Sequence, residues 1–303
     1  MATFLLVVCV VVGIAFIYHG VVVKGQRCKS KTVNVTGSNT GIGKMTALDL
    51  ARRGARVILA WRSKQLRLRS NEVVLMHLDL GSLKSVRSFG ETFLKTERRL
   101  DLLINNAGIY MPGTTEDGLG MMFGVNHIGH FPLTNLLLYH LNKCGQSRVV
   151  NVASVGHIFG TIDFNCLNSH KEVGVGDSFM DVFKTYCNSK LCNVLFNHEL
   201  AKILHSTNYL FFFSGAINSE LTRGINKVAM MLMKPFFMFF LKNSVAGSQS
   251  TLHCVLQEGL EPLSGCYFSN CTVRRAWSPS LDATSLNQIK SNFICHIHMV
   301  SRC

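Results

Sequence analysis

Residues 31–63, "KTVNVTGSNTGIGKMTALDLARRGARVILAWRS", contain the pattern that best predicts the fold of this chain. The β-branched run at 32–35 predicts a strand, and residues 44–54 have helical apolar spacing that stops at a glycine. The apolar run at 56–60 predicts a second strand. We expect the inner face of the helix to consist of Met45, Leu48, Leu50 and Ala51. The unit is a strand, a glycine-rich turn, a helix and a strand.

The glycines of this turn have a mechanical role. Gly37 allows the chain to turn tightly after the strand, while Gly41 and Gly43 let the backbone approach a pyrophosphate and let the helix pack closely. The start of the helix offers free N–H groups and the positive end of its dipole. This context predicts nucleotide binding, although glycine-rich turns also occur for packing alone.

The end of the second strand indicates which nucleotide binds. A site for NAD usually places an acid there to hold the ribose 2′-hydroxyl, but this chain has Arg62. An acid would repel a 2′-phosphate, whereas a guanidinium would bind it. We therefore predict NADP(H), with the alternative that Arg62 simply points to solvent.

Strand and helix patterns alternate through the rest of the chain. Strands are predicted at 71–80, 100–105, 147–154, 208–213 and 264–269, and helices at 83–97, 116–142 and 183–204. This alternation predicts an α/β fold with a doubly wound parallel sheet of the Rossmann type. Ligands bind at the carboxyl ends of such strands, where Gly37, 105–108, Ser154 and 214–215 would meet.

Residues 2–23 form an apolar run that contains no Asp, Glu, Lys or Arg, and this run is long enough to span a bilayer. Lys24, Arg27 and Lys29 follow this run, whereas a cleaved signal peptide has its positive charge before it. The positive-inside rule places the following chain in the cytosol. We predict a transmembrane anchor at 1–23, a nucleotide-binding domain at 24–275 and a tail at 276–303, the alternative for the first being a buried core helix.

Charge and cysteine content narrow the class further. Of a net charge of +14 over 303 residues, +11 lies in the first 69, where twelve Lys and Arg face one acid, Asp49. Nucleic acid, an anionic membrane surface or a phosphate-bearing ligand would each suit this charge, but the sequence has no nucleic-acid-binding module. The 11 cysteines include no Cys-x-x-Cys pair, so we predict reduced thiols and no metal site.

The stretch "TYCNSK", 185–190, places Tyr186 and Lys190 one helical turn apart on one face. An ordinary surface pair has the same spacing, so this stretch alone is weak evidence. In this chain, however, the stretch comes after several residues that are predicted to lie at the carboxyl ends of strands, which strengthens the case for a catalytic role. A nearby ammonium group favours the phenolate form and so lowers the pKa of a phenol.

Five motifs in order give the sequence a resemblance to the short-chain dehydrogenase/reductase family. They are "TGSNTGIG" at 36–43, Asp79-Leu80, "NNAG" at 105–108, Asn126 in "VNHIGHF", and Ser154 with Tyr186-x-x-x-Lys190. The resemblance implies hydride transfer with Tyr186 as proton donor, Ser154 as oxyanion partner, Lys190 on the nicotinamide ribose and Asn126 positioning a relay water. Plainer readings are a strand-end hydroxyl for Ser154 and a helix-bending amide for Asn126.

The turn and the resemblance together assign a set of residues to the cofactor. These are Gly37, Ser38, Asn39, Thr40, Gly41, Ile42, Gly43, Arg62, Asp79, Leu80, Asn106, Ala107, Gly108, Tyr186, Lys190, Gly215 and Ser219. Within the family the sequence resembles the membrane-anchored retinol dehydrogenases, which implies a lipophilic, retinoid-like alcohol or carbonyl. The expected location is the endoplasmic reticulum membrane with the catalytic domain facing the cytosol, and homodimers occur among relatives.

The sequence departs from the family pattern in two places near the site. Only residues 61–72 separate the second and third strands, where the family has a full helix. The turn at 213–215 reads Phe-Ser-Gly instead of His-Pro-Gly, although Gly215 is kept. These departures favour the alternative of a non-catalytic relative that acts as a membrane-attached nucleotide-binding or interaction protein. The apolar segment 228–241 could cover a greasy substrate, touch the bilayer or be ordinary core.

Overall fold

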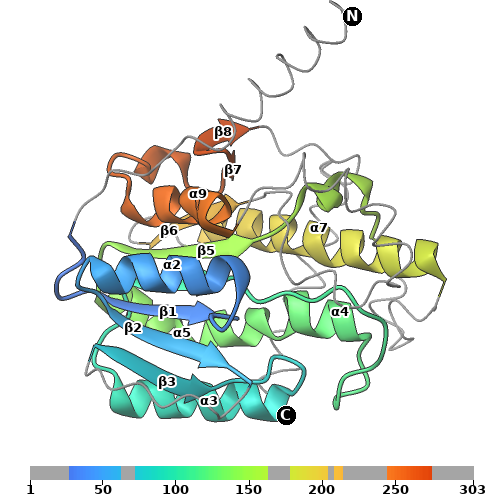
Figure 1. Ribbon diagram of the computed structural model, residues 1–303, viewed down its shortest axis with the longest axis horizontal. Coiled ribbons are helices and arrows are strands. Elements are labelled where there is room, and N and C mark those ends of the chain that lie inside the picture. The colour runs from blue at the N-terminus through green and yellow to red at the C-terminus, as the bar shows by residue number, and fades with distance from the viewer. Residues whose placement is uncertain (1–26, 63–71, 163–177, 204–207, 214–243, 275–303) are drawn as a thin grey trace, which may run out of the picture.

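The computed structural model describes residues 27–62, 72–162, 178–203, 208–213 and 244–274, which form a sheet with helices on both faces (Figure 1). The strands are β1 Thr32–Thr36, β2 Arg56–Trp61, β3 Val73–His77, β4 Leu102–Asn105, β5 Ser147–Val152, β6 Asn208–Phe213, β7 Tyr267–Ser269 and β8 Thr272–Arg274. The helical elements are α2 Gly41–Arg52, α3 Leu83–Thr96, α4 Met121–Phe123, η1 Gly124–Ile128, α5 His130–Lys143, η2 Val155–Phe159, α7 Phe179–Ile203, α9 Ser244–Leu256 and η4 Glu261–Leu263.

The described strands form one sheet in the order β3-β2-β1-β4-β5-β6-β7-β8. Strands β1 to β7 pair in parallel, and only β8 runs antiparallel to its neighbour. The chain order reverses between β1 and β4, which is where open α/β sheets bind ligands outside the carboxyl ends of their strands. The structure confirms the predicted doubly wound sheet.

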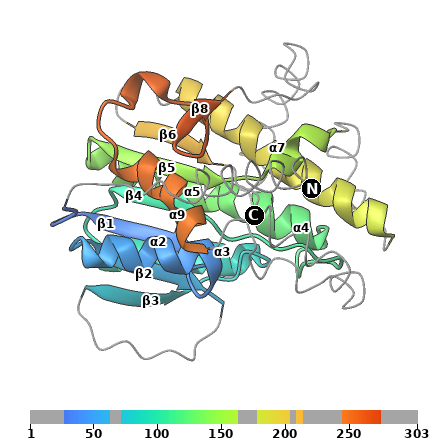
Figure 2. The same cartoon turned by 45° about the horizontal axis from the view of Figure 1, so that its top comes forward.

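Two hydrophobic cores hold the layers together, one on each face of the sheet. Helices α2 and α9 cover one face, with Leu50 and Leu252 packed on Val33, Val35 and the neighbouring strands (Figure 2). Helices α3, α5 and α7 supply the other core, which includes Phe89, Phe131 and Phe196. The central strands are therefore buried on both faces, as their continuous apolar sequence requires.

The inner face of α2 differs from the prediction. Leu48 is 38% exposed, whereas Gly43, Thr46, Ala47 and Leu50 are buried. The buried stripe starts at Gly43 because this glycine lies against the chain after β4, and it then recurs at helical spacing. The prediction that Leu48 lies on the inner face was wrong, because the close contact of Gly43 with the chain after β4 sets which side of the helix faces the sheet.

The helix predicted at 116–142 begins later and is not uniform. Residues before Met121 form a turn in which the Thr115 N–H donates to the Leu119 carbonyl at 2.8 Å. The helix then contains the π-helical segment η1 before α5. Helix α9 and strand β8 were not predicted. Polar residues such as Ser248, Ser250 and Thr251 are buried in α9, which blurs its apolar pattern.

Several predictions fall outside the described residues. These are the anchor at 1–23, most of the crossover at 61–72, Ser214, Gly215 and Ser219, the apolar segment 228–241, and the tail at 276–303. The two strands on either side of the short crossover do pair in parallel, with Val57 opposite Val73. Among the residues that the structure places, no helix combines the length and apolarity needed to cross a bilayer.

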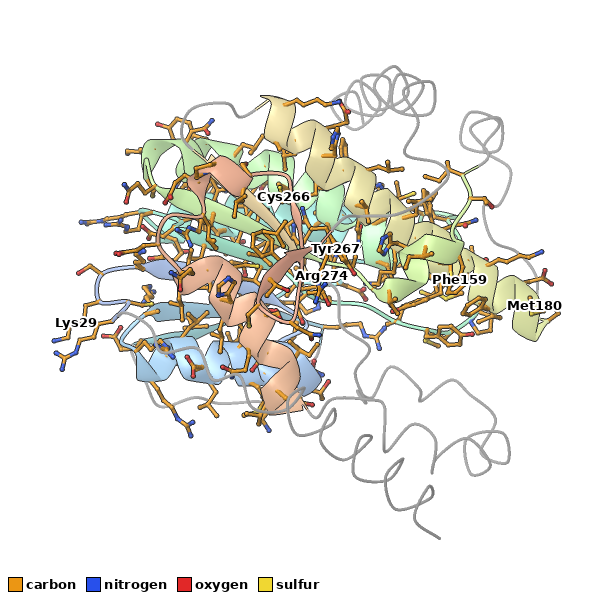
Figure 3. The ribbon with its side chains drawn as sticks, turned by 90° about the horizontal axis from the view of Figure 1, so that it is seen from above. Lys29, Phe159, Met180, Cys266, Tyr267 and Arg274 are labelled. Atoms are coloured by element: carbon orange, nitrogen blue, oxygen red, sulfur yellow. The ribbon has the colours of Figure 1, made fainter. Side chains whose placement is uncertain are left out.

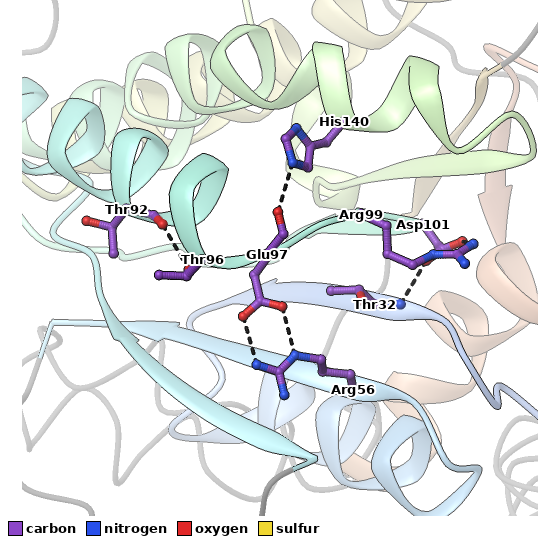
Figure 4. Close-up of polar contacts among 8 residues, drawn as sticks. All are labelled: Thr32, Arg56, Thr92, Thr96, Glu97, Arg99, Asp101 and His140. Atoms are coloured by element: carbon purple, nitrogen blue, oxygen red, sulfur yellow. Dashed lines mark hydrogen bonds and ion pairs between the residues drawn. The ribbon is translucent and has the colours of Figure 1, made fainter.

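A polar network holds the edge of the sheet where the strands begin, opposite the glycine-rich turn (Figure 4). The Arg56 guanidinium donates to both carboxylate oxygens of Glu97, at 2.7 and 2.9 Å. The buried carboxylate of Asp101 accepts the Thr32 N–H at 2.8 Å and also pairs with Arg99. These contacts join β1, β2 and the connection from α3 to β4.

Candidate active site

The turn after β1 brings its backbone against the chain that follows β4. Gly37 has a φ of +63°, and a Cβ at this position would lie 2.8 Å from the Ala107 Cα. A Cβ at Gly43 would lie 2.3 Å from the Asn106 Nδ2, which donates to the Thr36 carbonyl at 2.8 Å. Neither glycine leaves room for a side chain, so the turn and the "NNAG" segment form one packed unit.

The Thr36 hydroxyl also joins this unit. Its oxygen accepts the backbone N–H groups of Asn106 and Ala107, both at 2.9 Å. Thr36 was part of the quoted motif but was not assigned a site role. The signal for it was its place as the last residue of β1, from which a short side chain reaches the end of the adjacent β4.

The surface of this turn fits a pyrophosphate. Gly41 has a φ of +57°, and the N-cap residue Thr40 leaves the start of α2 without a side-chain cap or an acidic residue in its first turn. The Ser38 hydroxyl is buried and has no hydrogen-bond partner among the described residues. Free N–H groups at a helix start and an unpartnered buried hydroxyl are the donors that phosphate oxygens require. Asn39 is exposed, and Ile42 is half-buried.

The residues expected at the adenosine end follow β2 and β3. Arg62 is exposed one residue beyond Trp61, which pairs with His77 at the end of β3. The Asp79 carboxylate accepts the Gly81 N–H at 2.9 Å, and the Leu80 side chain is buried in the core. Arg62 and Asp79 thus both follow the carboxyl ends of neighbouring strands, at the edge where the glycine-rich turn lies.

Tyr186 and Lys190 project from α7 and are both buried. The Lys190 ammonium donates to the Val152 carbonyl at 3.1 Å and lies 5.8 Å from the centroid of the Tyr186 ring. The Tyr110 ring packs edge-on against Tyr186, with centroids 5.2 Å apart. Tyr110 follows "NNAG", so the segment that packs on the glycine turn also contacts the tyrosine.

The electrostatics of this pair correct one expectation. Burial raises the pKa of Tyr186 to about 12, while a hydrogen bond with the Ser154 side chain acts in the opposite direction. Burial lowers the pKa of Lys190 to about 8. The net shift of the Tyr186 pKa is upward, so the expected lowering was wrong for this structure, because burial disfavours the phenolate more than the hydrogen bond with Ser154 favours it.

Ser154 follows β5 and caps the short helix η2. Its side-chain oxygen accepts the Gly156 N–H at 3.2 Å, and its side chain bonds to Tyr186. The His157 ring lies behind it, with Nδ1 2.7 Å from the Ser154 carbonyl. The structure therefore brings Ser154 and Tyr186 into direct contact.

Asn126 is fully buried on the π-helical segment η1. Its Oδ1 accepts the Ile109 N–H at 2.8 Å, and its Nδ2 donates to the Ile109 carbonyl and to the Ser189 hydroxyl, each at 3.0 Å. Both amide hydrogens are used, so only Oδ1 retains capacity to accept a bond from a water. Short π-helical segments are rare but are often found at functional sites, and this one places Asn126 between the "NNAG" segment and α7.

Gly108, the last residue of "NNAG", lies beside two of the predicted catalytic residues. A Cβ at this position would lie 3.2 Å from the Lys190 Nζ and 3.6 Å from the Asn126 Oδ1. The four predicted catalytic residues are thus brought together: Ser154 contacts Tyr186, while Lys190 and Asn126 both lie beside Gly108. Buried residues that sequence reasoning did not assign are His130, Ser189 and Asn193. The signal for His130 was its position four residues after Asn126, on the same helical face.

Apolar side chains are exposed beside this site. Phe159 is 64% exposed and Met180 is 54% exposed, and Val155, directly after Ser154, is also exposed. Figure 3 shows Phe159 and Met180 at the same end of the molecule, beside the first turns of α7. The Phe159 ring contacts Phe183, with centroids 6.0 Å apart. In the described chain, no group of three or more His, Cys, Asp or Glu side chains could hold a metal ion.

The sheet order and the phosphate-fitting turn define a doubly wound protein of the dinucleotide-binding class. The short chain dehydrogenase family matches residues 31–171. The chain is 47% identical to Dehydrogenase/reductase SDR family member 13 of Bos taurus over 81% of this chain and 67% of that protein. It is 44% identical to Retinol dehydrogenase 12 of Homo sapiens over 86% of this chain and 84% of that protein. The chain belongs to the short-chain dehydrogenase/reductase family.

Solved structures agree with this assignment. An uncharacterised protein from Mycobacterium paratuberculosis superposes with a TM-score of 0.69 and 29% identity, covering 89% of this chain and 94% of that one. A 3-ketoacyl-(acyl-carrier-protein) reductase from Brucella melitensis, solved with NADH, gives a TM-score of 0.61 at 19% identity over 80% of this chain and 97% of its own. The second likeness shows the fold alone. The family assignment supports an alcohol–carbonyl oxidoreductase related to retinol dehydrogenases.

Proposed function

We propose that this protein is a membrane-anchored, NADP(H)-dependent oxidoreductase that interconverts an alcohol and a carbonyl on a lipophilic, retinoid-like substrate. The observation that carries the proposal is the contact between Ser154 and Tyr186 next to Lys190, beside the glycine-rich turn. A bound nicotinamide cofactor would supply or accept the hydride. The protein would supply the proton, the geometry and the exclusion of water.

The state of Tyr186 suits the reducing half of this interconversion. A pKa of about 12 keeps the phenol protonated near neutral pH. A protonated phenol can donate its hydrogen to a carbonyl oxygen as that oxygen gains negative charge. The Ser154 hydroxyl would donate a second hydrogen bond to the same oxygen, and Lys190 would stabilise the phenolate that remains.

Two features support the lipophilic substrate and the membrane anchor. Val155, Phe159 and Met180 present apolar side chains to solvent beside Ser154 and Tyr186, which suits a substrate with a long apolar body. Residues 2–23 have the length and apolarity of a membrane span. Extraction of membranes with alkaline carbonate tests the anchor, since a deletion of 2–23 should release a protein that otherwise stays in the pellet.

NADP(H) is proposed over NAD(H) because Arg62 stands exposed at the end of β2, where an acid would repel a 2′-phosphate. Titration of NADPH and NADH fluorescence tests this choice in wild type and Arg62→Gln. We expect Arg62→Gln to weaken NADPH binding about tenfold, as loss of one charge-assisted contact predicts, and to leave NADH binding unchanged. Tighter binding of NADH than of NADPH to wild type would contradict the proposal.

Activity is tested by following NADPH consumption with all-trans-retinal and with simple aldehydes. Tyr186→Phe removes only the hydroxyl, so we expect turnover to fall at least about a hundredfold while NADPH binding is retained. Cofactor binding without turnover of any aldehyde in wild type would favour the non-catalytic alternative. Equal turnover in wild type and Tyr186→Phe would exclude the role given to Tyr186.

A further inference from the structure

His130, the first residue of α5, connects two parts of the candidate site. Its ring is buried, with Nε2 2.9 Å from the Thr36 hydroxyl at the end of β1. Its Nδ1 lies 3.2 Å from the backbone carbonyl of Asn126 on η1. One imidazole thus bridges the end of β1, where the glycine-rich turn begins, and the π-helical segment η1, which contains Asn126.

The hydrogens around Thr36 determine which ring nitrogen carries the proton. The Thr36 oxygen already accepts two N–H groups, from Asn106 and Ala107. A hydroxyl has two lone pairs and one hydrogen, so Thr36 can only donate to His130. Its hydrogen has a second acceptor, the Ile104 carbonyl, but that oxygen lies at 3.4 Å compared with 2.9 Å for the imidazole Nε2.

The other side of the ring leads to the same tautomer. The Asn126 carbonyl is an acceptor, so the Nδ1 that faces it must be protonated to form a bond. The Asn193 amide donates to the same carbonyl at 3.0 Å and holds it from α7. With the hydrogen on Nδ1 and a lone pair on Nε2, every contact of the bridge is satisfied. The other tautomer would set a lone pair against the carbonyl.

We propose that His130 is a positioning residue which, as the neutral Nδ1–H tautomer, fixes Asn126 and its π-turn relative to the cofactor turn. This proposal rests on the proposed function for its effect on catalysis, but not for the bridge itself. Burial lowers the pKa of His130 to about 3, and the nearby Lys190 and His127 act in the same direction. The ring therefore stays neutral throughout the range in which the protein would work.

Two substitutions separate the halves of the bridge. The amide nitrogen of asparagine reaches the position of Nδ1, so His130→Asn keeps the bond to the Asn126 carbonyl and loses the one to Thr36. The amide oxygen of glutamine reaches the position of Nε2, so His130→Gln keeps the acceptor for Thr36 and loses the bond to Asn126. We expect His130→Asn to raise the Kd for NADPH about tenfold with kcat nearly unchanged.

His130→Gln should show the opposite pattern, with kcat reduced about tenfold and the NADPH Kd nearly unchanged. The matched control is His140→Asn, because His140 is a buried histidine on the same helix whose Nε2 contacts the Glu97 carbonyl instead. We expect it to lower Tm without separating Kd from kcat. Equal losses of Kd, kcat and Tm in both His130 variants would overturn the proposal.

The tautomer itself is tested on the full chain in detergent micelles, without cofactor, by NMR of ¹⁵N-labelled histidine. The His130 signals are assigned by their loss in His130→Gln. We expect an Nδ1–H pattern that does not titrate between pH 5 and 8. An Nε2–H pattern, or titration near pH 6.5, would overturn the bridge whatever the activity. Failure of wild type to bind NADPH or NADH would instead overturn the proposed function.

Discussion

The ammonium group of Lys190 lies beside Gly108, so that a Cβ at position 108 would come within 3.2 Å of Nζ. This relationship sets the last glycine of "NNAG" apart from a flexible turn glycine, because its missing side chain makes room for a buried cation. Lys190 has few alternatives, since it is enclosed and already donates to the Val152 carbonyl. The first prediction follows from this contact.

Gly108→Ala should lower kcat at least about tenfold, because a small displacement of Lys190 misplaces a catalytic group. We expect Tm to change little, since the new methyl meets the end of a side chain and not backbone. The comparison variant is Gly160→Ala, whose Cβ would lie 2.8 Å from the Cys187 carbonyl on the same helix. It should lower Tm clearly. A Gly108→Ala enzyme with wild-type kcat would contradict this account of the site.

Lys190→Met should stabilise the fold while removing activity. The unfolded lysine holds its proton up to its ordinary value of 10.5, whereas the folded one releases it near 8. Between these values the unfolded state binds more protons, so wild-type stability rises with pH, and below them the penalty is complete. The gain at pH 7 should be at most about 3 kcal/mol, since each unit of pKa shift is worth about 1.4 kcal/mol.

Urea unfolding at pH 7 and pH 9.5 measures this difference, which should shrink at the higher pH. Lys184→Met, at an exposed position on the same helix, serves as the control and should alter stability little at either pH. A Lys190→Met protein less stable than wild type at pH 7 would show that Lys190 contributes favourably to folding.

Asn34→Val should stabilise the protein by about 1–3 kcal/mol, the cost of burying an amide without partners. Asn34 lies in the middle of β1, fully buried, and neither its Oδ1 nor its Nδ2 has a partner among the described residues. Asn34-Val-Thr36 also matches the pattern of an N-glycosylation acceptor, and the burial of Asn34 makes it inaccessible in the folded protein. Thermal unfolding of the variant gives the measurement.

The matched variant is Asn151→Val, at a buried asparagine near the carboxyl end of β5. Its Oδ1 accepts from Asn105 at 2.8 Å and its Nδ2 donates to Asn197 at 3.2 Å, so removing it takes one hydrogen bond from each of these neighbours. We expect Asn151→Val to lower Tm where Asn34→Val raises it. Destabilisation by both substitutions would mean that Asn34 has a partner.

Asp101→Asn should destabilise the fold by about 1–3 kcal/mol without changing the NADPH Kd. Its carboxylate accepts the buried Thr32 N–H and pairs with Arg99, at the edge of the sheet opposite the glycine-rich turn (Figure 4). The control is Glu91→Gln, which removes a pair with Lys95 whose partners are 69% and 78% exposed and which should contribute almost nothing. A loss of cofactor affinity in Asp101→Asn would contradict the separation of the two edges.

Much of the fold was predictable because its signals are local. The strand at 32–36, the glycine-rich turn and the strand at 56–61 lie within one short stretch, and each has its own pattern of apolar, β-branched or glycine residues. The π-turn at Asn126 was not predictable, because it depends on contacts that Asn126 makes with Ile109 and Ser189 from other parts of the chain. The same holds for the exposure of Leu48, which depends on how closely Gly43 packs.

Short motifs in the sequence were enough to predict the family, the order of most strands and helices, and the candidates Ser154, Tyr186 and Lys190. The protonation state of those side chains, in contrast, depends on the tertiary structure. Burial raises the pKa of Tyr186, which keeps the phenol neutral, and lowers the pKa of Lys190. The spacing of residues in the sequence does not indicate how deeply a side chain will be buried. The bridge from His130 to Thr36 and Asn126 likewise depends on the tertiary structure, since the contact with Thr36 exists only once β1 and α5 pack together.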